Sequence, residues 1–140
     1  MTLSHVLAAK IVLKAIFWGV PLLASPVELY AALGIPQPVP ILLPRLLGAA
    51  YLALMVVYWF GWADVRAGRH PQAAVRAGLV SNGLAAILLA VHGVAGYWDH
   101  WGWLGRAYMW ASLVAAASLT AGLLAVSKER AEASDAADSR

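Results

Sequence analysis

The chain contains four long apolar blocks, and this feature constrains its fold more than any other. A helix needs about 20 mainly apolar residues to cross roughly 30 Å of hydrocarbon. Three blocks reach that length, and they cover residues 41–63, 77–98 and 104–126. Only 12% of the residues are charged, against roughly 25% in soluble domains. Because so few charges cannot cover these blocks with a wettable surface, the sequence predicts helices that span a membrane.

A fourth span is expected at the start of the chain, although it contains two lysines. The apolar stretch 11–24 is too short to cross a bilayer alone, and an extension back to about Leu3 makes it long enough. Lys10 and Lys14 then lie within the span, and we expect their long side chains to reach back to the interface. Pro21 is expected to kink the helix. The predicted fold is an all-α integral membrane bundle of four helices.

A short interfacial helix is expected between the first two spans. Ser25 and Glu28 have the spacing of a capping box, with Pro26 at the first helical position. Gly34 is expected to end this helix. The prolines that follow favour an extended chain leading into the second span: Pro36, Pro38, Pro40 and Pro44.

The basic residues predict how the spans are oriented, because cytoplasmic ends of membrane helices are rich in Lys and Arg. With both termini inside, the outer side receives only Arg45 and Arg106. The inner side receives the other eight: Lys10, Lys14, Arg66, Arg69, Arg76, Lys128, Arg130 and Arg140. Trp59 and Trp62 are then expected at the inner interface, and Trp98, Trp101 and Trp103 at the outer one. Residues 127–140 form a polar tail, expected to extend the last helix and then fray.

Several classes of function lack their signature in this sequence. The absence of cysteine excludes disulfides and thiolate metal sites, and we expect no metal site. The net charge of +3 does not indicate nucleic-acid binding, because the basic residues flank the apolar blocks and form no single stripe. The chain has no nucleotide-binding glycine loop, no histidine pair at metal-binding spacing and no serine nucleophile elbow. The sequence does not identify a cofactor.

Small residues indicate which helix faces pack closely in a bilayer. Three faces of this kind are present: Gly48, Tyr51, Met55 and Tyr58 in the second span; Gly78, Ser81, Ala85, Leu88, His92 and Gly96 in the third; and Ala111, Ala115, Ser118 and Gly122 in the fourth. Either these faces turn inward in one compact bundle or they form a homo-oligomer, and both alternatives remain open.

The third span carries two polar side chains that are candidates for ligand binding. His92 shares a face with Ser81 and could accept a proton, ligate a cofactor or bond to a polar head group. The alternative is a neutral imidazole bonded to a neighbouring Ser, Tyr or carbonyl. Asn82 lies about 80° around the helix from His92, and we expect it to bond between helices, worth on the order of 0.6–2 kcal/mol.

A second group of candidates gathers at the outer side, where Glu28, Arg45, Asp99, His100 and Arg106 have similar depth. This mixture could form a polar mouth above an apolar cavity. The alternative is ordinary ion pairing, of Arg45 with Glu28 and of Arg106 with Asp99. Lys10, Lys14 and the basic 66–76 loop are interpreted as contacts to anionic lipid, and a pairing of these lysines with Asp64 is the less favoured alternative.

Two features mark the region before and at the start of the second span: the sequence Leu-Gly-Ile-Pro at 33–36 and the stretch Pro-Arg-Leu-Leu-Gly-Ala-Ala-Tyr-Leu at 44–52. In these features the chain resembles the DoxX-like group of small bacterial four-helix membrane proteins. Arg45 and Gly48 match the group's pattern, whereas His92 has no counterpart in it. The resemblance covers residues 10–126. It implies a bacterial inner-membrane protein, in a group where some members are linked to quinone-coupled redox complexes and many have no assigned activity.

Three functional hypotheses follow. The favoured one is an accessory subunit of a membrane complex or a binder of a lipid-like or quinone-like molecule. The second is a small enzyme or redox partner acting on a quinone or isoprenoid, with His92, Glu28 and Arg45 in its site. The third is a small dimeric transporter, for which the sequence has no carboxylate in the middle of a span. Membrane lipid is an expected partner in each case.

Overall fold

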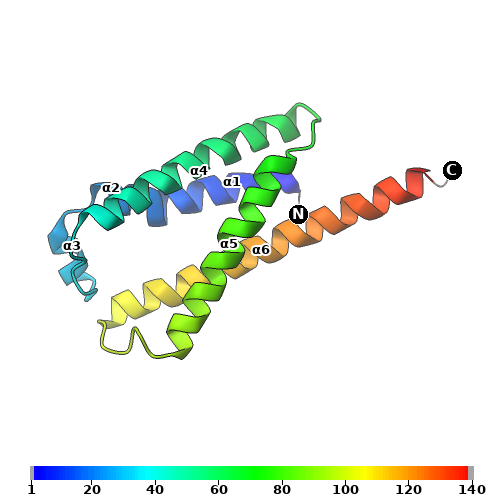
Figure 1. The fold of residues 1–140 in the computed structure, drawn as a ribbon. Coiled ribbons are helices and arrows are strands. Elements are labelled where there is room, and N and C mark those ends of the chain that lie inside the picture. Colours follow the sequence, from blue (N-terminus) through cyan, green and yellow to red (C-terminus); the bar gives the residue numbers. More distant parts are fainter. Residues whose placement is uncertain (1, 139–140) are drawn as a thin grey trace.

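The computed structural model describes residues 2–138, and side chains as far as Lys128, as helices joined by turns (Figure 1). Four helical segments are long and apolar enough to cross a membrane. These segments are Leu3–Ala24, Leu42–Arg66, Gln72–Val94 and Trp103–Lys128. No strand occurs in the part of the chain that is described. The predicted fold class, an all-α membrane bundle of four helices, is confirmed.

The first span is made of three helical pieces. They are α1 (Leu3–Leu13), the π-helical turn η1 (Lys14–Gly19) and α2 (Val20–Ala24). A kink was expected at Pro21, and the structure shows this π-helical turn shortly before it. Pro21 has no N–H to offer the Phe17 carbonyl four residues earlier. The hydroxyl of Tyr108, from the last helix, donates to this carbonyl instead.

The short helix α3 (Val27–Ala32) follows the first span, as the sequence predicts. The prediction that Ser25 and Glu28 form a capping box is wrong, however, because the helix begins after Pro26 and no side chain caps it. At the other end Gly34 has φ +65° and ends the helix as expected. The Ile35 N–H donates to the Tyr30 carbonyl at 2.8 Å in a Schellman motif.

The two middle spans are α4 (Leu42–Arg66) and α5 (Gln72–Val94). Helix α5 begins and ends earlier than the predicted range 77–98. Gly96, at φ +74°, ends it in the same way as Gly34 ends α3, with the Tyr97 N–H bonded to the His92 carbonyl at 3.1 Å. His92 therefore lies in the last turn of α5.

The last helix, α6 (Trp103–Asp138), runs without interruption through the polar segment that follows the fourth span. The sequence predicts that the last helix extends into this polar segment and frays at its end. The final two residues, 139 and 140, lie outside the described part of the chain.

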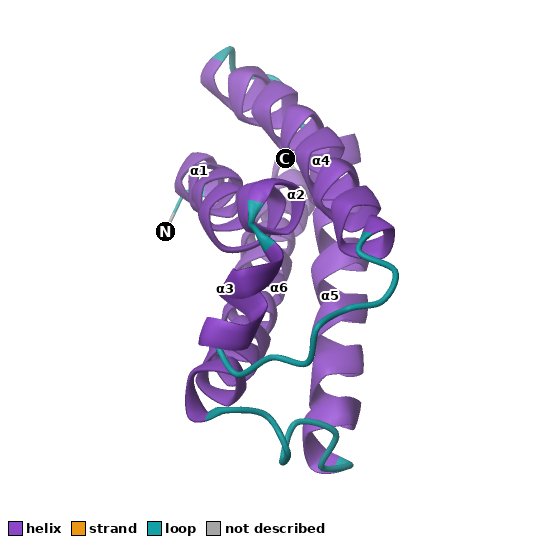
Figure 2. Cartoon of the chain, turned by 90° about the vertical axis from the view of Figure 1, so that its left-hand side faces the viewer, coloured by secondary structure: helices purple, strands orange, loops and turns teal. Residues whose placement is uncertain are grey.

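The bundle is formed by two packed pairs of helices (Figures 1 and 2). The first span lies along α4, and α5 crosses α6, which has the longest axis in the molecule. The apolar core lies near the N-terminal end of α1. Its buried members are Leu3, Val6, Leu7, Tyr58, Ala74, Val75, Leu123 and Val126.

The inward faces match the predicted small-residue faces only in part. In α4 the predicted residues Gly48 and Tyr58 are buried. In α6 the alternative of inward packing is not realised, because Ala111 and Ser118 are exposed. The buried side of α6 instead carries Gly105, Ser112, Leu123 and Val126. In α5, Gly78 is buried but Leu88 and His92 are exposed. An apolar helix in lipid has no hydrophobic preference for one of its faces, so contacts with the neighbouring helices decide this rotation.

The opposite end of the bundle closes through two glycines. The Gly102 N–H, just before α6, donates to the Gly34 carbonyl at 2.8 Å. A Cβ on Gly34 would lie 2.5 Å from the Gly102 Cα, so this backbone contact requires glycine. Nearby Trp98, expected at the interface, is instead 6% exposed and packs edge-on against Trp110. Through the hydrogen bond of Gly34, the Leu-Gly-Ile-Pro segment after α3 thus contacts the start of α6.

Candidate functional site

Polar side chains are buried inside the bundle, among helices that are otherwise apolar. Lys10 is 0% exposed, Asn82 3% and Lys14 7%. Lys10 lies in the last turn of α1, and Lys14 is the first residue of the π-helical turn. The expectation that both lysines reach back to the interface is wrong. The two residues are four positions apart and therefore share one face of the helix, and this face points both side chains toward the tyrosines of α4.

The Lys10 ammonium lies between α4 and α5. Its Nζ is 4.0 Å from the centre of the Tyr58 ring. On the other side is Gly78, and a Cβ there would overlap with the Nζ. The Nζ has no hydrogen-bond partner. A lysine ammonium has three N–H donors, and the face of one aromatic ring leaves most of them unsatisfied.

The Lys14 ammonium lies further along the same face of the span. Its Nζ is 4.6 Å from the centre of the Tyr51 ring and 5.9 Å from that of Tyr58. Trp18 extends this aromatic group, with ring-centre distances of 5.8 Å to Tyr51 and 5.3 Å to Tyr108. Both lysines are therefore held against aromatic faces, a cation–π arrangement.

The third span contributes the remaining polar groups. The Tyr58 hydroxyl and Ser81 Oγ are 2.8 Å apart, and Ser81 also donates to the Gly78 carbonyl at 3.4 Å. Asn82 is one helical turn from Gly78, on the same side of α5. Its buried Nδ2 has no hydrogen-bond partner, and no bond from its amide to another helix is present among the described residues. We call Lys10, Lys14, Tyr58, Ser81 and Asn82 the dilysine site.

No carboxylate neutralises the dilysine site. The sequence has seven acidic residues, and four of them follow Lys128. Glu28 and Asp99 are exposed beyond the ends of the spans. Asp64, the remaining one, pairs with Arg69 at 2.6 Å. The alternative of a pairing between Asp64 and the lysines is therefore not realised. The site is rich in N–H donors, and among the described side chains no carboxylate serves them as an acceptor.

The candidates at the outer side do not form a shared site. Arg45 donates to the carbonyls of Leu22, Leu23 and Ser25, with its Nη2 2.6 Å from the Ser25 oxygen. The expected ion pair with Glu28 is therefore wrong. The guanidinium instead satisfies carbonyls at the end of α2, which have no further helical N–H to bind.

His92, Asp99, His100 and Arg106 are all exposed. His92 Nδ1 bonds to the Leu88 carbonyl, 2.8 Å away on its own helix, and its ring lies 5.0 Å from Tyr97. Among the described side chains no ion pair joins Arg106 to Asp99, so that expectation is wrong. Within the same part of the chain, no three side chains of the metal-binding types gather around a common point.

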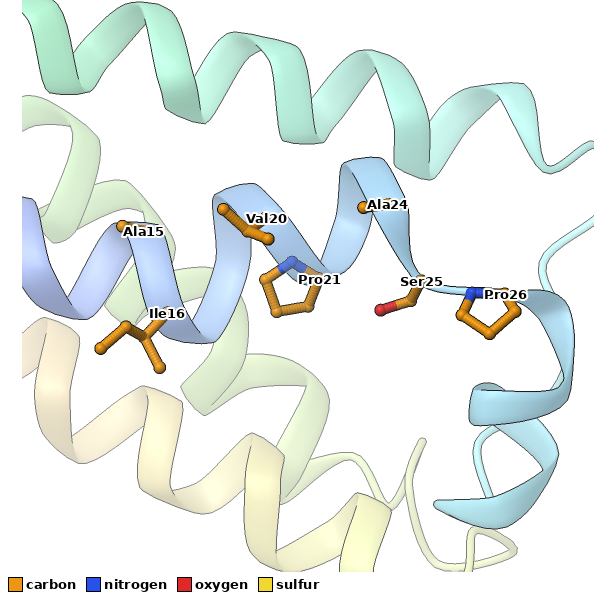
Figure 3. A pocket seen from close by; sticks show the side chains of 7 residues that line it. All are labelled: Ala15, Ile16, Val20, Pro21, Ala24, Ser25 and Pro26. Carbon is orange, nitrogen blue, oxygen red and sulfur yellow. The ribbon is translucent and has the colours of Figure 1, made fainter.

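An open apolar groove runs beside the outer half of the first span (Figure 3). Its volume is about 560 Å³. The lining residues are Ala15, Ile16, Val20, Pro21, Ala24, Ser25 and Pro26. The Ile16 and Pro21 side chains point to the same side of the span (Figure 3). The groove begins next to Lys14 in the sequence and is bounded at its far end by the turn into α3.

The sequence contained a signal for the dilysine site that its interpretation missed. Lys10 and Lys14 are four residues apart, and Tyr51 and Tyr58 are seven apart, so each pair shares one helix face. The tyrosine face was correctly predicted to turn inward. Two lysines on one face of the first span and two tyrosines on one face of the second indicate that the ammonium groups stack on the aromatic rings.

No family model, curated protein or solved structure matches the chain. The function is therefore inferred from the site itself.

Proposed function

We propose that this multi-pass membrane protein binds a lipid-like molecule and holds its polar head at Lys10, Lys14 and Asn82. The observation that carries the proposal is the burial of Lys10 Nζ and Asn82 Nδ2 without a partner. In a bilayer no water compensates such donors, and each unsatisfied group costs several kcal/mol. Since the spans offer no carboxylate, an acceptor brought by a ligand is the simplest way to satisfy them.

A lipid-like ligand fits the surroundings of the site. The helices that carry the donors face hydrocarbon, so a molecule that reaches them sideways must dissolve in the bilayer. The groove, whose lining begins at Ala15, the residue after Lys14 in the sequence, is apolar, and its volume of about 560 Å³ is in the range of roughly 300–1,000 Å³ that is usual for ligand pockets. We propose that the tail of the ligand lies in this groove.

We also propose that the chain is related to the DoxX-like group, some of whose members are linked to quinone-coupled redox complexes, and that it acts as an accessory subunit or as a binder of a lipid-like molecule. The enzyme hypothesis receives less support. It combined His92 with Glu28 and Arg45, and among the described residues no hydrogen bond or ion pair joins these three side chains: His92 bonds to Leu88, and Arg45 to the end of α2.

We further propose that the protein resides in the bacterial inner membrane with both termini in the cytoplasm. The charge distribution supports this orientation even though Lys10 and Lys14 turn inward. Without them, six of the eight inner basic residues remain against Arg45 and Arg106 outside.

The replacement Lys10→Met tests the binding proposal, because it keeps an unbranched side chain, one atom shorter, and removes the charge. We expect the lipid-like molecule that co-purifies with the wild-type protein in a mild detergent, identified by mass spectrometry, to be lost from this variant. We also expect the ligand-free variant to unfold at a higher temperature, since it no longer carries the desolvation cost of a buried ammonium without a hydrogen-bond partner.

Lys128→Met is the matched control, because Lys128 is exposed at the end of the fourth span, away from the dilysine site. It should retain the bound molecule. If the Lys10→Met protein is folded and carries the same molecule in the same amount, the proposed function is wrong.

A further inference from the structure

We infer that the head group taken by the dilysine site is an anion, a carboxylate or a phosphate, rather than the neutral carbonyl of a quinone. This inference rests on the proposed function and names the chemical class of its ligand. It is carried by the position of the two ammonium groups relative to each other and to the acidic residues of the chain.

The two cations share one aromatic ring. Lys10 Nζ and Lys14 Nζ lie 4.0 Å and 5.9 Å from the centre of the Tyr58 ring. Like charges this close repel strongly where the dielectric constant is low. A neutral carbonyl accepts a hydrogen bond but leaves this repulsion unchanged. A negatively charged oxygen group accepts the hydrogen bonds and also lowers the electrostatic energy of both cations.

The number of donors allows such a group to accept more than one hydrogen bond. The Tyr58 ring covers one side of the Lys10 ammonium, and the remaining N–H groups have no acceptor. Asn82 adds an amide N–H, buried and without a partner, one turn beyond Gly78. Carboxylates and phosphates have several acceptor oxygens, and charge-assisted hydrogen bonds are roughly twice as strong as neutral ones. A quinone carbonyl has a single oxygen for this purpose.

The aromatic rings explain how the two ammonium groups are held between the helices. Tyr51 and Tyr58 present their faces to them, and a cation over such a face is attracted by the ring, more strongly when it is desolvated. This attraction is smaller than the cost of burying an ammonium in a span. The rings therefore hold the lysines in place, and the binding energy of the anion supplies the remainder.

The test compares two brominated probes that differ only in charge, in nanodiscs of phosphatidylcholine. The probes are dibromostearic acid, at a pH where its carboxyl group is ionised, and its methyl ester. Bromine quenches tryptophan fluorescence, and Trp18 is the reporter because it contacts Tyr51 beside Lys14. The Trp18→Phe protein gives the background from the other tryptophans. Decylubiquinone and inorganic phosphate serve as competitors.

We expect the acid to bind at least about tenfold more tightly than the ester, which corresponds to 1.4 kcal/mol. In the Lys10→Met/Lys14→Met protein the acid should lose this advantage. Decylubiquinone should compete poorly. Because the comparison of acid with ester uses the wild-type protein, it remains valid even if the double variant does not fold.

Each other outcome overturns a distinct claim. Equal binding of acid and ester, with both displaced by decylubiquinone, would leave the lipid-like ligand in place and refute the anionic head group. Displacement of the acid by inorganic phosphate would confirm an anion site and refute the lipid-like ligand. If neither probe quenches Trp18 above the background, the proposed function and this inference both fail.

Discussion

At the scale of single residues, the buried lysines depend on a glycine in the opposite helix. Lys10 Nζ occupies the space beside Gly78 that a side chain would fill. The same absent Cβ would lie 2.7 Å from Leu123 Cδ1. Gly78 therefore lets α5 approach both the first span and α6. Small residues have this role in membrane helices generally, and here the approach positions a charged group.

The replacement Gly78→Ala tests this packing. We expect it to lower the free energy of unfolding by about 1–3 kcal/mol, because the methyl group must displace Lys10 or Leu123. Thermal denaturation in detergent measures the change. Gly83→Ala is the matched control on the same helix, since nothing lies within 4 Å of the position of its Cβ. Equal melting temperatures for the two variants would show that Lys10 does not pack against Gly78.

At the scale of the helical element, the first span contains a break that the rest of the bundle compensates. Pro21 and the π-helical turn before it disturb the regular hydrogen bonds of the span. Two side chains from other helices donate to its carbonyls. Tyr108 bonds to Phe17, and Arg45 to the end of α2. Free carbonyls are tolerated in a membrane only where such partners reach them.

A double-mutant cycle tests the link between Tyr108 and Pro21. We expect Tyr108→Phe to destabilise the protein by about 1–3 kcal/mol, because it leaves the Phe17 carbonyl without a donor. In a Pro21→Ala background the restored N–H at position 21 can serve that carbonyl, so the same change should cost about 1 kcal/mol less. Denaturation of the four proteins gives the coupling energy.

Tyr97→Phe is the control for this cycle, because Tyr97 is 60% exposed and its hydroxyl makes no hydrogen bond. It should have little effect in either background. A coupling energy near zero would mean that the Tyr108 hydroxyl does not replace the N–H that proline lacks.

At the scale of the whole molecule, the four spans require that the turn between α4 and α5 lies on the opposite side from the two other connections. The chain has no cysteine, so single cysteines can be introduced without background. Val39→Cys and Asp99→Cys mark the two outer connections, and Ala67→Cys marks the inner turn. All three positions are exposed.

We expect a membrane-impermeant maleimide to label the proteins with Val39→Cys and Asp99→Cys in intact spheroplasts. The protein with Ala67→Cys should be labelled only after the membrane is permeabilised. The reverse pattern would keep the four spans and invert the orientation. Labelling of all three from one side would refute the four-span arrangement.

The sequence by itself determined the class of the protein, the number of spans and several of their ends. Apolar length is a property of each block alone, so it predicted four helices without knowledge of their contacts. Gly34 also acts locally, because a positive φ ends a helix at that residue. The end of α5 at Gly96 follows the same rule, although the apolar pattern continued to Trp98 and hid it.

Only the tertiary structure decided which way each helix faces. Asn82 and Tyr58 were recognised from the sequence as inward residues, and both are buried. Lys10 and Lys14 were assigned to the interface, and for the fourth span the sequence did not decide between an inward face and an exposed one. The physical reason is that lipid and protein interior are equally apolar, so the hydrophobic pattern of a span does not distinguish them. Which face of the first span points inward is decided by close packing at Gly78 and at the two tyrosine rings. These contacts form only when residues from three separate helices come together, so one span alone cannot reveal them.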